Sequence, residues 1–148
     1  MSEIDKSPTK KTDICLILFT VTGDEKIKNV YTYIEDKHQT VVTAEYDPNK
    51  DDSYWDCISR TLLSSVGLDI DADKLSINDV FYLGDLTSPY FSDEIKCFGI
   101  NVSNIKELES KLQSNSGKFH KIGFHHLVGG ECTDTLLLSS SFLLASYF

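Results

Sequence analysis

The pattern of apolar and polar positions divides the chain into strand-like and helix-like segments in a definite order. Apolar runs rich in β-branched and aromatic residues predict strands over Ile14–Val21, Asn29–Glu35, Thr40–Tyr46, Asp79–Leu86 and Glu94–Val102, with a final strand over Phe119–Leu127. The third of these strands ends before the turn Asp47-Pro48-Asn49, because proline cannot continue a β-ladder.

Between the third and fourth of these strands the period changes to that of a helix. Trp55, Ile58, Leu62 and Val66 recur at intervals of three and four residues, which places them on one apolar stripe. Asp52 or Ser53 can cap the start of this helix, and a glycine directly after Val66 can end it in the left-handed conformation. The pattern predicts a helix over 52–66.

Two further segments later in the chain have helical features, one over a short span and one at the C-terminal apolar stretch. Ile105, Leu108 and Leu112 have helical spacing, although the span 103–113 is short enough to be largely a loop. The last apolar stretch predicts a helix capped by Thr133 or Asp134 and buried on most sides. The order of strands, a helix, strands and a terminal helix favours an α+β fold over a regular βαβ array.

Length and composition limit the organisation of the protein. The chain has 148 residues, of which 41% are hydrophobic, so we expect a polar disordered tail over 1–12 and a single domain over 13–148. The tail has no apolar signal segment, and the apolar C-terminus is too short and too rich in serine to span a bilayer. We therefore expect a soluble intracellular protein with no membrane association.

Charge and cysteine content narrow the classes of partner and site. A net charge of −9 and a pI near 4.7 argue against non-specific nucleic-acid binding, which needs clustered lysine and arginine. No cysteines form a C-x-x-C pair, which favours reduced core thiols over a disulfide framework. His125 and His126 precede Cys132, but these residues alone are not a recognisable zinc ligand set, so no metal site is predicted there.

The stretch Asp51–Ile70, DDSYWDCISRTLLSSVGLDI, resembles the sequence motif of the Nudix hydrolases, G-x5-E-x7-R-E-U-x-E-E-x-G-U with U a bulky aliphatic residue. The first glycine of the motif falls on Tyr46. The remaining matched positions, in order, are Asp52 for the early glutamate, then Arg60, Leu62, Gly67 and Leu68.

The charged positions of that motif differ in this chain. Thr61, Ser64 and Ser65 stand where the three helix glutamates of the family bind Mg²⁺, and neutral hydroxyls cannot supply that charge. Glu94 follows the next strand-and-loop segment and is the place to look for a substitute acid. The resemblance thus implies no catalytic residue and no cofactor, with Mg²⁺ expected if the chain is a divergent hydrolase.

The resemblance also implies a particular architecture. We expect a Nudix-like α/β/α sandwich of mixed sheets with a helix on each face. The sequence is also similar to Nudix-like proteins encoded by large bacteriophages, which would place it in the host cytoplasm or in a virion. The alternative is an unrelated α+β domain, in which Arg60 is a solvated or ion-paired residue and Gly67 is an ordinary C-cap.

Three functions fit these features. The favoured one is a catalytically inactive Nudix fold that serves as a structural or protein-interaction module, with other proteins as partners in a homo- or hetero-oligomeric assembly such as a virion. The others are a divergent hydrolase of nucleoside diphosphate derivatives, using Asp52, Glu94 or other acids to hold a metal ion, and a nucleotide-sensing domain that keeps the pocket without the chemistry. Aromatic residues expected at a protein interface are Tyr90, Phe91, Tyr147 and Phe148.

Overall fold

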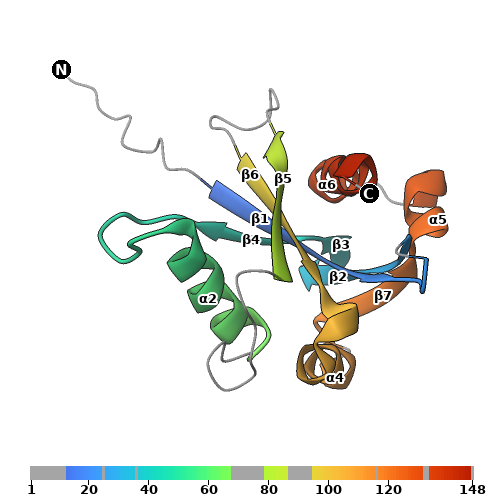
Figure 1. Cartoon of the computed structure of the whole chain (residues 1–148), viewed down its shortest axis with the longest axis horizontal. Helices are drawn as coiled ribbons and strands as arrows, with labels where there is room; N and C mark the ends of the chain where they lie inside the picture. Colours follow the sequence, from blue (N-terminus) through green and yellow to red (C-terminus); the bar gives the residue numbers. More distant parts are fainter. Residues whose placement is uncertain are drawn as a thin grey trace.

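The computed structural model describes residues 13–24, 26–35, 37–67, 79–86, 95–115, 117–131 and 134–147. Its strands are β1 (Asp13–Val21), β2 (Ile27–Glu35), β3 (His38–Thr40), β4 (Val42–Glu45), β5 (Val80–Leu86), β6 (Ile95–Asn101) and β7 (Phe119–Gly123). Its helical elements are α2 (Tyr54–Ser65), η3 (Val102–Asn104), α4 (Lys106–Ser114), α5 (Phe124–His126), η4 (Leu127–Glu131) and α6 (Thr135–Tyr147). Figure 1 shows their arrangement.

Strand β1 is the centre of a mixed sheet of seven strands. Strand β6 runs parallel to β1 along one edge, and β5 pairs antiparallel with β6. On its other edge β1 pairs with β4 over Asp13–Leu16 and with β2 over Leu18–Val21. Because β4 and β2 pair with different halves of β1, the sheet divides into two branches at this edge. Strands β3 and β7 both pair with β2.

Helices cover both faces of this sheet (Figure 1). Ile14, Leu16 and Leu18 of β1 belong to a core cluster that also contains the buried residues of α2 and α4. The intervening residues of β1, Cys15 among them, belong to a second cluster that contains the buried leucines of α6. Burial on both faces explains the continuous apolar run of β1, and the prediction of an α+β fold with a helix on each face is confirmed.

Helix α2 begins and ends at residues that the sequence singles out. The Ser53 hydroxyl accepts a hydrogen bond from the Asp56 amide at 3.4 Å, so Ser53 and not Asp52 is the N-cap. Gly67 has a φ of 81°, and its N–H donates to the carbonyls of Leu62 and Leu63 at 3.0 and 3.1 Å. The predicted helix and its glycine terminus are therefore confirmed.

Some predicted boundaries were wrong. The strand expected over Thr40–Tyr46 is divided at Val41, because β3 pairs with β2 while β4 pairs with β1. The final strand ends at Gly123, and the chain continues in helical turns that bury Leu127 completely. The segment left open between helix and loop forms α4, which buries Leu108 and Leu112 against the sheet.

The terminal helix and the cysteines follow the sequence-based expectations where the structure describes them. The Asp134 carboxylate accepts from the Leu137 amide at 2.8 Å and caps α6. Cys15, Cys57 and Cys97 are free, buried thiols. Cys132, Thr133 and the tail over 1–12 lie outside the described residues. Within the described part of the chain, no helix has both the length and the apolar character needed to cross a membrane.

Candidate functional site

An ion pair between Asp51 and Arg60 fixes the start of α2. The guanidinium group donates twice to the Asp51 carboxylate, from Nη2 at 2.7 Å and from Nε at 3.2 Å. It also donates to the backbone carbonyl of Glu45 at 3.1 Å. Asp51 is 3% exposed and accepts a further bond from the Asp47 amide. Arg60 therefore ties the helix to the end of β4 and to the loop between them.

The protonation of this pair follows from its geometry. The hydrogen bond from Arg60 holds the pKa of the Asp51 carboxyl below its usual range. The same bond raises the pKa of the Arg60 guanidinium above its ordinary value. Both groups thus stay charged at neutral pH, and the carboxylate of Asp51 is occupied by the arginine.

Asp52, the motif position expected to carry an acid, is exposed and lies outside this pair. Its backbone N–H donates to the Asp56 carboxylate at 2.9 Å. The motif arginine thus binds the residue before the predicted remnant. The spacing of the motif selects Asp52 but does not specify the partner of the arginine, because both aspartates lie in the irregular turn before the helix.

Two of the three hydroxyl residues at the motif glutamate positions donate to carbonyls of their own helix. Thr61 is 4% exposed, and its hydroxyl donates to the Cys57 carbonyl at 2.7 Å. Ser64 is exposed and donates to the Thr61 carbonyl at 3.2 Å. Ser65 is half-buried at the last turn. Threonine and serine commonly bond to the helix backbone in this way, and no negative charge results.

These residues do not fit the Mg²⁺ ion that the motif resemblance implies. Mg²⁺ in proteins is held by carboxylates and water, and the motif positions on α2 present neutral hydroxyls. Asp51 is engaged by the arginine. The described residues contain no group of three or more His, Cys, Asp or Glu that could hold a metal ion. Leu68 and Glu94, which were also predicted to belong to the site, lie outside the described residues.

Beside the first turn of α2 lies an aromatic cluster that the sequence pattern did not predict. Tyr54 contacts Tyr46 with ring centroids 4.8 Å apart and Phe98 at 6.0 Å, and Phe98 contacts Tyr82 at 5.4 Å. The Lys96 ammonium lies 5.8 and 5.6 Å from the ring centroids of Tyr54 and Tyr82. Its members come from α2, β5, β6 and the end of β4, so only the sheet register brings them together.

Of the residues predicted at an interface, the structure describes Tyr147. Its side chain is 52% exposed, while its ring lies 5.5 Å from that of Phe81. Phe142, five residues earlier in α6, is 53% exposed. Tyr90, Phe91 and Phe148 lie outside the described residues.

Comparison with known proteins identifies the fold. No protein-family model matches the chain, and no curated protein matches it. Solved structures do match, among them a mutT/nudix family protein from Listeria innocua with 12% identity and a TM-score of 0.60, covering 93% of this chain and 94% of that one. The protein therefore has a Nudix-like fold.

Two further solved structures have this arrangement. Shewanella oneidensis NrtR has 12% identity and a TM-score of 0.63, and the match covers 89% of this chain but 62% of NrtR, less than two thirds of its length. The C-terminal domain of mouse MUTYH, solved with human PCNA, has 6% identity and a TM-score of 0.62, with 93% and 89% of the two chains covered. Identities this low establish the fold alone.

Proposed function

We propose that this chain is a catalytically inactive Nudix-fold protein that acts through contacts with other proteins. The proposal rests on the residue types in α2. Thr61, Ser64 and Ser65, which are neutral, occupy the motif's glutamate positions. Two of these hydroxyls donate to carbonyls of their own helix. The remaining charged pair, Asp51 and Arg60, holds the helix to the preceding loop.

The physical requirement of the family's reaction supports inactivity. A metal ion lowers the barrier to attack on a diphosphate by neutralising its charge and activating water, and carboxylates are needed to hold that ion. Thr61 is 4% exposed, so even a carboxylate restored there would be a buried charge without a partner. The sequence has therefore adapted this position to the core.

The first experiment is an activity assay of the full chain. With Mg²⁺ or Mn²⁺ present, we expect no hydrolysis of ADP-ribose, diadenosine polyphosphates or dNTPs above the rate without protein. Asp52→Asn and Glu94→Gln are the matched variants, because these are the two acids that the sequence offers first to a divergent hydrolase. Turnover by the unaltered chain that disappears in either variant would replace this proposal with the hydrolase.

Helix α6 offers a surface suited to a protein partner. Between Thr135 and Tyr147 the helix carries no charged residue. One side packs in the core through Leu137 and Leu144, yet Phe142 and Tyr147 on its exterior are 53% and 52% exposed. A helix with no charged side is usually buried for the most part, and aromatic residues are enriched in the centres of protein interfaces.

The solved neighbours and the charge of the chain favour a protein over a nucleic acid as partner. The mouse MUTYH domain was solved in complex with PCNA, so a domain with this fold can serve in protein binding. NrtR was solved with a 27mer DNA, but this chain has a net charge of −9, which opposes binding to phosphates. The similarity to phage-encoded proteins leads us to propose a virion as one setting for the assembly.

The second experiment tests the surface on α6. We expect the intact chain to form an oligomer or complex with an interface above roughly 1,000 Å². Phe142→Ser should abolish the assembly in light scattering without unfolding the chain. Leu63→Ser is the matched control, since Leu63 is 57% exposed on α2 at the opposite face of the sheet and should leave the assembly intact.

Self-association and binding to a different protein are separated by adding a pull-down. A complex with another protein supports the proposal if Phe142→Ser loses it and Leu63→Ser retains it. An intact chain that stays monomeric and has no partner sensitive to Phe142→Ser contradicts the assembly proposal.

A further inference from the structure

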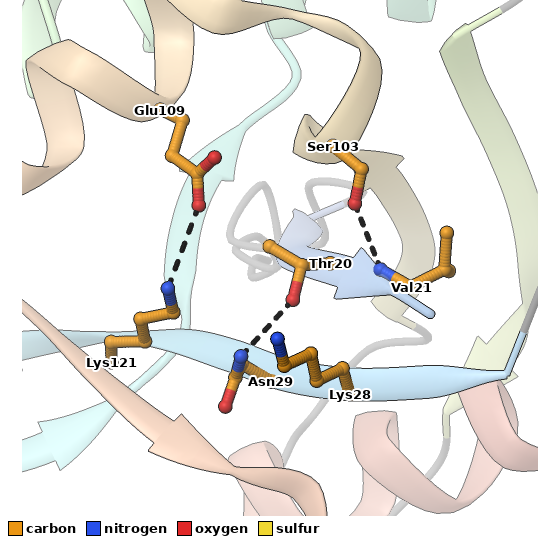
Figure 2. A pocket seen from close by; sticks show the side chains of 7 residues that line it. All are labelled: Thr20, Val21, Lys28, Asn29, Ser103, Glu109 and Lys121. Atoms are coloured by element: carbon orange, nitrogen blue, oxygen red, sulfur yellow. Dashed lines mark hydrogen bonds and ion pairs between the residues drawn. The ribbon is translucent and has the colours of Figure 1, made fainter. Parts of the chain in front are cut away.

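A polar cavity of about 230 Å³ lies between the sheet and the segment η3–α4 (Figure 2). None of its lining residues belongs to α2, so it is separate from the site with the Nudix motif. Its lining comes from β1, β2, η3, α4 and β7 and consists of Thr20, Val21, Lys28, Asn29, Ser103, Glu109 and Lys121.

The two hydroxyl groups in this cavity are arranged as donors toward its interior. Ser103 Oγ accepts a hydrogen bond from the Val21 amide at 2.8 Å, and Thr20 Oγ1 accepts one from Asn29 Nδ2 at 3.3 Å. Because each oxygen already serves as an acceptor, each hydroxyl proton is left to donate elsewhere. Thr20 is 6% exposed, and within the described part of the chain neither hydroxyl donates to a protein acceptor.

Two lysines add positive charge to these donors. Lys28 and Lys121 both line the cavity, and Figure 2 shows Lys121 directed toward Glu109. Lys121 lies 3.7 Å from the Glu109 carboxylate, whereas Lys28 is exposed and forms no ion pair among the described residues. The two ammonium groups therefore exceed the single carboxylate of the cavity by one charge.

Glu109 is held by a second neighbour, which limits its repulsion of an anion. The Tyr31 hydroxyl donates to Glu109 Oε2 at 2.9 Å. Burial and this bond raise the pKa of Tyr31 to about 12, so the phenol stays protonated and keeps donating at neutral pH. The Glu109 carboxylate thus accepts bonds from Tyr31 and Lys121 at the side of the cavity.

We propose that this cavity binds the phosphate group of a small molecule. The terminal oxygens of a phosphate can accept bonds from both hydroxyls and both ammonium groups, and bonds to a charged group are the stronger kind. Pockets for drug-sized ligands have volumes of about 300–1,000 Å³, so a cavity of about 230 Å³ suits a smaller ligand. The cavity has an excess of one positive charge, although the whole chain has a net charge of −9.

The test follows backbone amide signals by NMR during titration of the full chain. The probes are inorganic phosphate and glycerol 3-phosphate, with chloride at equal ionic strength as the reference. We expect saturable shifts at Thr20, Asn29 and Ser103. Replacing both lysines, Lys28→Gln with Lys121→Gln, should weaken binding about tenfold or more, since charged hydrogen bonds are lost.

Two further variants make the test specific. Thr20→Val keeps the shape of a β-branched side chain and removes its donor, so it should weaken binding several-fold. Lys50→Gln, in the exposed turn after β4, is the matched charge control and should leave binding unchanged. If the double variant fails to fold, Lys28→Gln alone serves, because the Lys28 side chain is exposed and forms no ion pair among the described residues.

The two probes distinguish the source of the phosphate. Tighter binding of glycerol 3-phosphate indicates a phosphate ester with hydroxyl groups, and equal affinities indicate recognition of the phosphate alone. Shifts no larger than those with chloride overturn the proposal. Equal affinities of the lysine variant and the Lys50→Gln control also overturn it.

Discussion

Gly67→Val tests whether the backbone conformation at the end of α2 is required for stability. Gly67 has a φ of 81°, in the region that side chains with a Cβ atom rarely adopt. A Cβ atom built at this position has no neighbour within 4 Å, so valine would meet backbone strain and not a packing clash. The N–H bonds of residue 67 to Leu62 and Leu63 also remain available to valine.

The expected loss of stability in Gly67→Val is therefore the cost of backbone strain alone. The left-handed conformation costs an L-residue about 1–2 kcal/mol, and a β-branched side chain lies at the upper end of that range. In a domain of this size such a loss lowers the melting temperature by roughly 2–8 °C. Gly67→Asn should lose less, because asparagine tolerates this conformation.

Urea unfolding followed by circular dichroism measures this difference. The matched control is Gly117→Val, since a Cβ atom at Gly117 also has no neighbour within 4 Å and its φ is not positive. The strain of Gly67→Val should therefore be absent from the control. Equal losses in the two variants would refute the argument that the left-handed backbone requires glycine.

Three other predictions concern the ion pair, the buried tyrosine and the core. The lowered pKa of Asp51 contributes stability above its ordinary value of 3.8, and this contribution is lost as the pH falls through the folded-state pKa. The free energy of unfolding of Arg60→Ala should therefore differ most from the unaltered chain above pH 4, and the difference should shrink toward pH 2; a difference independent of pH would contradict the pairing. The pKa of Tyr31 is raised from 10.0 to about 12, so the contribution of Tyr31 to the free energy of unfolding is present below pH 10 and is lost as the pH rises toward 12. Tyr31→Phe should lose less stability over this alkaline range, because it removes the buried phenol that donates to Glu109. An alkaline profile identical to that of the unaltered chain would exclude the titration of Tyr31 as the cause of the loss. Leu62→Ala should cost about 2–5 kcal/mol in chemical denaturation, because Leu62 is fully buried in the core beside α2, and a loss below 1 kcal/mol would mean that the core closes around the cavity.

The sequence by itself determined the elements whose causes are local. The unbroken apolar run of β1 predicted a strand, and its continuity is explained by a core in two halves that divide its alternate residues between them. The start of α2 at Asp52 or Ser53 and its end at Gly67 were predicted because a helix terminus depends on residues within one turn. The motif on α2 also indicated the Nudix-like fold that the solved structures share.

The tertiary structure alone decided which side chains meet. Arg60 binds Asp51 and not Asp52, a choice that rests on the course of an irregular loop. The bond between Val21 and Ser103 joins residues 82 positions apart, and the phosphate cavity draws on five separate elements. Periodicity and capping depend on neighbours within a few residues, whereas these contacts depend on strand register and on the parallel pairing of β1 with β6, which no local pattern specifies.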